Sequence, residues 1–281
     1  MSPKTSQNIA FFLLFASAVL VILPVAMVIV IIVKNGAAAI SWSFLSEMPR
    51  AGMREGGILP AIVGTFCLVA GAVLFALPLG LSAAIYLSEY ARDSAMNRVV
   101  RLAIINLAGV PSVVFGLFGL ALFVGFFHFG ASILAGSLTL ALMILPVIIT
   151  SSREALGSVP KSFREVSLSL GATKLQTIKY AVLPHALPGI LTGTILGVGR
   201  AAGETAPILF TVAAFYLPRL PHSIFDQVMA LPYHLYVLST QVPNVAEKTR
   251  YGTALVLLSI VLMMNLLAVT IRAHFRSKKK W

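Results

Sequence analysis

The sequence has few charged residues and almost no cysteine. Charged side chains make up 11% of its 281 residues, whereas a soluble domain carries roughly 25%. This composition does not suit a surface in water, so it excludes an ordinary soluble domain. The only cysteine, Cys67, lies inside an apolar run. A single cysteine excludes an internal disulfide and a thiolate metal site, and we interpret Cys67 as a packing residue.

The motifs of common enzymes are also missing. The sequence contains no G-x-x-x-x-G-K-[ST] loop, no G-x-S-x-G elbow and no H-E-x-x-H pair. The stretch from Gly197 to Ala202 fits G-x-G-x-x-A, but it follows no strand and lies in an apolar run, so it predicts no dinucleotide site. We therefore expect no catalytic residue, no metal and no cofactor in this chain.

Long apolar runs dominate the chain. Apolar residues make up 58% of it, and the mean hydropathy is +0.95. Several runs approach the ~20 residues that a helix needs to cross a bilayer. Because the ten-residue alternation of a membrane barrel is absent, we predict an all-α membrane protein with six transmembrane helices. The predicted spans are 9–33, 58–88, 99–127, 130–150, 187–215 and 251–272.

The first predicted span, 9–33, exceeds the ~7–15 residues of a signal-peptide core, so we expect it to remain as an anchor. Orientation follows from the segments between spans, which carry fourteen Lys and Arg on one side and six on the other. The positive-inside rule then predicts that both termini and segment 151–186 are cytoplasmic and that segment 216–250 is external. The net charge of +12 reflects this topology, not nucleic-acid binding. We expect a single membrane domain, 1–281, and the family resemblance described below implies a bacterial cytoplasmic membrane.

Segment 151–186 is too polar to lie in lipid. Pro160 suits the first turn of a short helix, and Gly171 suits its C-terminal stop. Thr173 can cap a second short helix that ends at Pro184. This pattern predicts a docking element that projects from the bundle. The alternative is a basic amphipathic hairpin on anionic lipid.

Segment 216–250 contains four prolines and an apolar stretch, 224–238, that Asp226 and His234 interrupt. The stretch is too short and too broken for a seventh span. We expect a helix that rests on the outer face, as a membrane-interface element or a partner surface.

The fifth predicted span carries two charges, Arg200 and Glu204. A charged side chain at mid-membrane costs ~2.5–3.5 kcal/mol on insertion scales. At helical spacing both charges fall on the face of three glycines, which are Gly189, Gly193 and Gly197. Small residues at this spacing predict close helix packing, so both charges should face protein or a water-filled path.

Two interpretations of Arg200 and Glu204 remain open. They could form a buried ion pair that only fixes helix packing. Alternatively they belong to an anion pathway, in which the guanidinium binds an oxyanion and Glu204 limits the local positive charge. Pro207, one turn later, allows a kink of the kind found in broken transporter helices.

The cytoplasmic segment resembles a known loop. Glu165-Val-Ser-Leu-Ser-Leu-Gly171, nine further residues and then Ala181-Val-Leu183-Pro184 are similar to the EAA loop of ABC importer permeases. The glutamate, the glycine and the final Leu-Pro match. Two alanines of the family pattern are replaced by Val166 and Ser167, and its isoleucine is replaced by Ala181. The resemblance implies that Glu165, Gly171, Leu183 and Pro184 couple the chain to an ATPase.

Two further strings narrow the resemblance. Gly109-Val-Pro-Ser-Val-Val-Phe-Gly-Leu-Phe-Gly119 and Arg200-Ala-Ala-Gly-Glu-Thr-Ala-Pro207 resemble, with the rest of the chain, the phosphate ABC importer permeases of the PstA type. The resemblance implies a type I ABC permease fold and a phosphate pathway through Arg200, Glu204 and Thr205. It implies Arg153, at the cytoplasmic end of the fourth span, as a weaker candidate for the same pathway.

The resemblance also implies partners. These are a sibling permease, a cytoplasmic ATPase dimer that binds the ATP and Mg²⁺, and an external phosphate-binding protein. A permease of this kind for another anion or solute, such as sulfate or molybdate, is the first alternative. A stand-alone channel or secondary carrier is the second, and it would need an internal repeat or ion-coupling carboxylates.

Overall fold

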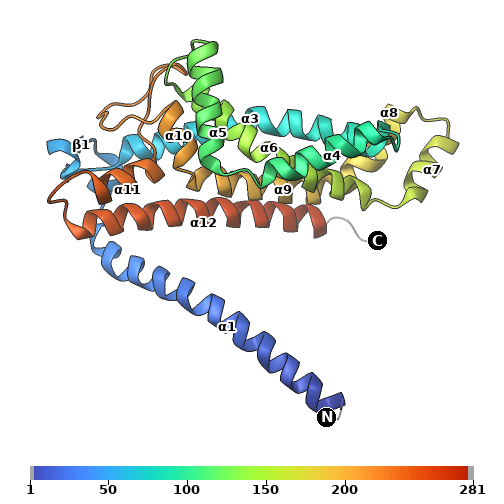
Figure 1. Ribbon diagram of the computed structural model, residues 1–281, viewed down its shortest axis with the longest axis horizontal. Coiled ribbons are helices and arrows are strands. Elements are labelled where there is room, and N and C mark those ends of the chain that lie inside the picture. The colour runs from blue at the N-terminus through green and yellow to red at the C-terminus, as the bar shows by residue number, and fades with distance from the viewer. Residues whose placement is uncertain (1–2, 278–281) are drawn as a thin grey trace.

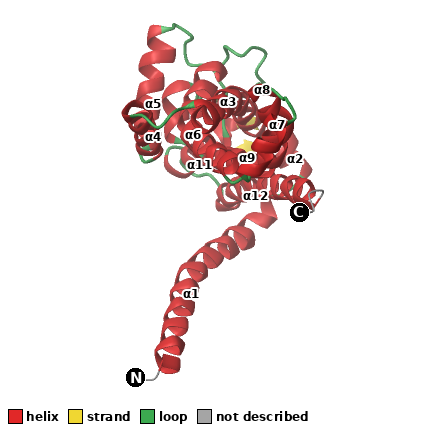
Figure 2. Cartoon of the chain, turned by 90° about the vertical axis from the view of Figure 1, so that its right-hand side faces the viewer, coloured by secondary structure: helices red, strands yellow, loops and turns green. Residues whose placement is uncertain are grey.

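The computed structural model describes residues 3–277, which form a helical bundle with one projecting arm (Figures 1 and 2). The all-α expectation is confirmed, apart from a two-stranded antiparallel hairpin of β1 (Pro49–Arg50) and β2 (Glu55–Gly56). The helices are α1 (Pro3–Gly36), α2 (Trp42–Ser46), α3 (Leu59–Ile85), α4 (Ala95–Ala108), α5 (Ser112–Gly119), α6 (Ile133–Gly157), α7 (Lys161–Ser169), α8 (Lys174–Gln176), α9 (Leu183–Gly203), α10 (Ala206–Thr211), α11 (Leu231–Thr240) and α12 (Glu247–Ser277).

Within the described residues, five helical stretches are long and apolar enough to cross a bilayer, and the bent pair α4 and α5 can make a sixth. The five are Gln7–Ala39, Leu59–Tyr90, Ile133–Gly157, Lys174–Gly203 and Glu247–Ala273. Each overlaps a span that the sequence predicts. Counted with the bent pair as one span, these stretches give the six spans that the sequence predicts, with changed boundaries in the third and fifth.

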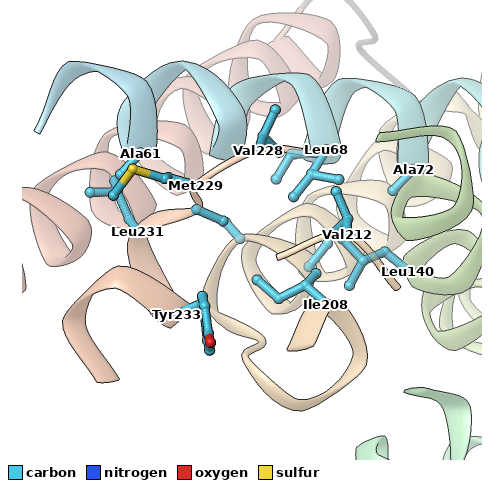
Figure 3. Packing of buried hydrophobic residues seen from close by; sticks show 14 of the residues in the cluster. Ala61, Leu68, Ala72, Leu140, Ile208, Val212, Val228, Met229, Leu231 and Tyr233 are labelled. Carbon is cyan, nitrogen blue, oxygen red and sulfur yellow. The ribbon is translucent and has the colours of Figure 1, made fainter. Parts of the chain in front are cut away.

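The core lies where α3, α6 and α9 run side by side, with α12 along one flank (Figure 1). Figure 3 shows the part of this core in which Leu68 of α3 and Leu140 of α6 meet Ile208 of α10 and the following Val212. Gly64 of α3 lies against the backbone carbonyl of Met229, so any side chain there would collide with it. Segment 216–250 is thus packed directly onto the bundle.

The third predicted span, 99–127, is not one helix. The axes of α4 and α5 differ by 102°, and the break lies between them at Gly109 to Pro111. Pro111 adopts an extended conformation, with φ −57° and ψ 140°. It has no backbone N–H and disfavours helix in the residue before it. The chain therefore changes direction at Pro111, whereas α3 continues through Pro78.

The fifth predicted span, 187–215, is also wrong at both ends. Its helix begins at Lys174 as a continuation of α8, passes through a π-helical turn at Thr177–Val182, and ends at Gly203. Pro184 does not stop it. This proline follows shortly after the π-helical turn, and the helix continues through it as α9. After Gly203 the chain breaks before α10.

Helix α1 projects from the bundle as an arm (Figure 1). In the most apolar part of this span, no residue is buried against the rest of the described chain. The arm meets α12 at its C-terminal end, where Gly36 lies against the backbone of Tyr251. In Figure 1 the N-terminal end of α1 and the C-terminal end of α12 lie toward the side of the molecule that carries α7 and α8.

Segment 216–250 differs from its expected form. Only part of the apolar stretch 224–238 is helical, as α11, and this helix does not rest on the surface. Leu231, His234 and Leu238 are buried, and α11 packs against α3 and α12. The backbone N–H of Leu231 donates to the Thr65 hydroxyl of α3 at 2.8 Å. The helix is thus an integral part of the core.

His234 gives this packing a pH dependence. Its side chain is 2% exposed, and α11 lies outside the candidate spans. Burial lowers the pKa of His234 from 6.5 to about 4, because it disfavours the charged imidazolium. Between these values the unfolded chain binds a proton that the folded chain does not, so stability falls as pH decreases through this window.

We predict that His234→Gln flattens this dependence. From pH 6.5 to 5 the wild-type chain should lose about 2 kcal/mol that the variant retains, at ~1.36 kcal/mol per pH unit. The measurement is the thermal unfolding midpoint in detergent at both pH values. The exposed His222 is the control, since His222→Gln should leave the wild-type dependence in place. Equal slopes for the wild type and His234→Gln would contradict the prediction.

Candidate functional site

The break between α9 and α10 holds the predicted charged pair. Arg200 lies in the last turn of α9, and Glu204 follows the end of this helix with an extended backbone, φ −79° and ψ 132°. Pro207 lies in the first turn of α10 and has no N–H with which to continue α9. The ideal helix assumed from the sequence therefore stops at Gly203, yet the two charged side chains still meet.

Arg200 and Glu204 form a single, partly exposed ion pair. Arg200 Nε donates to Glu204 Oε1 at 3.3 Å, and the side chains are 32% and 20% exposed. Within the described chain the two terminal guanidinium nitrogens of Arg200 make no hydrogen bond. The pair is therefore neither sealed in a dry core nor saturated, and Arg200 retains donors for another oxyanion.

Glu204 lines a narrow cavity, about the size of one water molecule. Thr65, Leu68 and Val69 of α3 form one wall, and Leu140 of α6 lies nearby. These α3 residues lie about 9–15 Å along the helix from Leu59, at ~1.5 Å per residue. Glu204 thus lies beside the candidate span of α3, toward the end of that span at Leu59.

Thr205 lies at the same break and is half-buried. Its hydroxyl has no hydrogen-bond partner among residues 3–277, whereas the Thr211 hydroxyl donates to the Pro207 carbonyl of its own helix at 2.8 Å. Thr205 therefore remains a candidate for the pathway beside Arg200 and Glu204.

The glycine face of α9 packs on α6. A methyl group at Gly189 would overlap Ala155, and one at Gly193 would overlap Ser151. Gly197 is looser, with 3.5 Å between an added Cβ and Ile144. The glycines therefore set the approach of two helices within this chain, in agreement with their predicted packing role.

The structure does not bring Arg153 to the charged pair. Arg153 lies on α6 between Ser151 and Ala155, which face Gly193 and Gly189. Arg200 is seven residues further along α9 than Gly193, about 10 Å at ~1.5 Å per residue. Arg153 instead lines a small cavity with Arg101 and Thr150. The sequence alone does not show how far Arg153 lies from the Arg200–Glu204 pair.

The predicted docking element, segment 151–186, is called the coupling loop below. It contains the two predicted short helices, except that the second continues past Pro184 into α9. Gly171 has φ +82° and ends α7, with its N–H donating to the Leu168 carbonyl and that of Ala172 to Ser167. This is a Schellman C-cap, which needs the left-handed conformation that glycine adopts freely. Thr173 and Gln176 then cap the next helix reciprocally.

The coupling loop exposes five large apolar side chains, namely Val166, Leu168, Leu170, Leu175 and Tyr180. Glu165 and Pro184 are exposed as well, whereas Leu183 packs against a second core cluster that includes Leu156 and Val182. An apolar face without a covering element in this chain is typical of an interface.

A further contact in this region was not predicted. Arg164 of α7 pairs with Glu89, which follows the end of α3. The two residues are 75 positions apart, and neither stands in a motif. No local sequence signal could have indicated this pair. Among the described residues no group of His, Cys, Asp and Glu side chains could hold a metal ion.

Comparisons with known proteins agree with one another. A family model described as binding-protein-dependent transport system inner membrane component matches residues 76–281. The probable ABC transporter permease protein YqgI of Bacillus subtilis is 35% identical, over 84% of this chain and 85% of that protein. The phosphate transport system permease protein PstA 1 of Mycobacterium tuberculosis is 35% identical, over 96% and 88%. The probable phosphate transport system permease protein PstA of Methanocaldococcus jannaschii is 36% identical, over 91% and 90%.

Solved structures share the fold. A bacterial ABC transporter involved in the import of alginate matches with a TM-score of 0.68 and 13% identity, over 96% of each chain. The inward-facing MetNI methionine ABC transporter matches with a TM-score of 0.60 and 15% identity, over 78% of this chain and 97% of that chain. The architecture is thus that of an ABC importer permease.

We predict that Gly193→Ala lowers the thermal unfolding midpoint in detergent, because the new methyl group overlaps Ser151 and forces α9 away from α6. Overpacking of this kind costs about 1–3 kcal/mol. The control is Gly203→Ala on the same helix, where nothing lies within 4 Å of an added Cβ. Similar midpoints for the two variants would show that the glycine face does not set this packing.

Proposed function

The chain belongs to the family of binding-protein-dependent transport system inner membrane components, and we propose that it is the permease subunit of an ATP-driven importer of inorganic phosphate. The observation that carries this proposal is the partly exposed Arg200–Glu204 pair at a helix break inside the membrane. The names of relatives that are 35–36% identical over most of their length support phosphate as the cargo.

The chemistry of Arg200 suits an oxyanion. Its guanidinium is charged at every physiological pH and offers donors in a planar fork that matches phosphate. Glu204 occupies one donor and balances the charge, so a passing anion competes with a carboxylate and is released again. The free terminal nitrogens of Arg200 are the groups that would hold phosphate.

Energy comes from another chain. We infer that an ATPase dimer, which holds the ATP and Mg²⁺, docks on the apolar side chains of the coupling loop beside Glu165. A sibling permease completes the membrane unit, and an external binding protein delivers phosphate. Closure of the ATPase dimer then switches the pair of permeases between inward-open and outward-open states.

We propose that the coupling loop and both termini are cytoplasmic. The excess of basic residues on that side supports this orientation. So does the position of the first residues of α1 and the last residues of α12, toward the side of α7 and α8 (Figure 1). The hairpin β1–β2 and α11 would then lie at the external end, where the binding protein docks.

We predict that Arg200→Ala lowers phosphate uptake about 10- to 100-fold, since a hydrogen bond to a charged group contributes roughly 1.5–3 kcal/mol. The assembled complex should still form and hydrolyse ATP. The measurement is uptake of radiolabelled phosphate by proteoliposomes, normalised to the permease that they contain. Unchanged uptake would refute the pathway role.

Glu204→Gln distinguishes the two interpretations of the pair. Altered uptake with normal amounts of assembled protein supports a pathway, whereas loss of assembled protein supports a pair that only fixes packing.

Wild-type proteoliposomes tested with sulfate and molybdate check the cargo, since transport of either in place of phosphate would show that the proposed substrate is wrong.

We predict that Gly171→Ala weakens ATPase binding, because a side chain at φ +82° costs about 1–2 kcal/mol in the left-handed region. The C-cap of α7 loosens, and the apolar side chains of the loop lose their arrangement. The measurement is the amount of ATPase that co-purifies with the permease. Gly157→Ala is the control, since that residue ends α6 without positive φ and with space around it. Equal co-purification for both variants would contradict the prediction.

A further inference from the structure

The turn that follows α3 joins the coupling loop to the bundle. This turn, Tyr86–Tyr90, is π-helical and is closed by a hydrogen bond from the Ala91 N–H to the Tyr86 carbonyl at 2.8 Å. Arg164 of α7 donates from Nε to Glu89 Oε2 at 3.0 Å and from Nη2 to Glu89 Oε1 at 2.6 Å. The pair is bidentate, the strongest geometry that these two groups can form.

The Glu89–Arg164 pair is also the most buried ion pair in the described part of the chain. The Glu89 side chain is 7% exposed and that of Arg164 is 21% exposed. By contrast, the nearby Arg101–Asp93 pair is 3.8 Å long, and Asp93 is 97% exposed. A buried bidentate pair resists solvent and holds its geometry, which an exposed pair does not.

Arg164 connects three elements at once. Besides binding Glu89, it donates from Nη2 to the Leu156 carbonyl at 2.9 Å and from Nη1 to the Val159 carbonyl at 2.8 Å. Leu156 lies in the last turn of α6, and Val159 follows it. One guanidinium thus ties α7 of the coupling loop to the ends of both α3 and α6.

A second contact reaches the same turn. Lys174 of α8 places its Nζ 4.7 Å from the ring centroid of Tyr90. The coupling loop therefore holds the π-helical turn from two successive helices, through a carboxylate and through an aromatic face. This makes the turn the place where a displacement of the loop reaches α3.

The far end of α3 borders the candidate pathway. The helix is continuous from Leu59 to Ile85, and its residues Thr65, Leu68 and Val69 line the cavity beside Glu204. A shift of the turn at Tyr86–Tyr90 is carried along this one helix toward the charged pair. The packing of α3 on α6 and α9 keeps the motion collective.

We propose that Glu89 and Arg164 are positioning residues that couple the ATPase to the pathway, by making α3 move with the coupling loop. This inference rests on the proposed function. The pair touches neither cargo nor ATP. Its role is to transmit movement from the docking surface to the cavity at Glu204, and a purely structural pair would only maintain the amount of folded protein.

The test uses Glu89→Gln in the complete complex, with the sibling permease, the ATPase and the binding protein in proteoliposomes. Glutamine keeps the shape of the side chain and leaves the bonds of Arg164 to Leu156 and Val159 intact. Arg164→Lys is the second variant, because lysine cannot form the bidentate pair. Asp93→Asn, which removes the exposed ion pair nearby, is the matched control.

Three quantities are measured, namely ATPase content, ATP hydrolysis stimulated by the binding protein, and phosphate imported per ATP. We expect normal ATPase content in both variants and an about tenfold fall in phosphate per ATP, within the range of coupling between sites. The double variant should lose no more than the worse single variant, as expected for residues that act together. The control should match the wild type.

An unchanged ratio in Glu89→Gln and Arg164→Lys would overturn the proposal. So would a loss of transport fully explained by less assembled complex. If the wild-type complex imports no phosphate, the proposed cargo is wrong, and the coupling role is decided by hydrolysis alone. In that case, loss of stimulation by the binding protein in Glu89→Gln supports the role, and full stimulation refutes it.

Discussion

Inside a bilayer, every charge and every backbone polar group needs a partner within the protein, and this constraint explains how the region around Arg200 is built. A continuous helix would satisfy its backbone, yet α9 ends at Gly203 and frees carbonyls near the charged pair. This irregular backbone is tolerable because the neighbouring helices enclose it. The close packing of α9 on α6 through Gly189 and Gly193 brings those helices near enough to do so.

The same constraint determines which parts of the structure the sequence could predict. Hydropathy identifies segments that must avoid water, so it located the spans 9–33, 58–88, 130–150 and 251–272 well. Hydropathy depends on composition and does not show the direction in which a helix axis runs. Hydropathy therefore assigned 99–127 to one span, although the axes of α4 and α5 differ by 102° across Gly109 to Pro111. Burial of α11 had no local signal either, because it depends on contacts with α3 and α12.

Within the site, the sequence predicted those features that depend on residues close together in the chain. Arg200 and Glu204 are four residues apart, and their pairing survives the end of the helix because the extended backbone at Glu204 still returns the carboxylate to Nε. Gly171 was identified as a stop because positive φ has a clear residue preference. The Glu89–Arg164 pair escaped detection because its members come from helices far apart in the chain. Only the fold brings α7 to the end of α3.

The geometry of the Arg200–Glu204 pair bears on how a permease can bind an anion without retaining it. A lone guanidinium in a low-dielectric span would bind phosphate too tightly for release, and a fully buried bidentate pair would leave no donor for it. The observed pair lies between these limits, with one hydrogen bond of 3.3 Å and both side chains partly exposed. Under the proposed function, an arriving anion exchanges with Glu204 for the guanidinium, and the displaced carboxylate then repels it. The Glu89–Arg164 pair, bidentate and buried, has the opposite design, which suits a contact that must persist while the coupling loop moves.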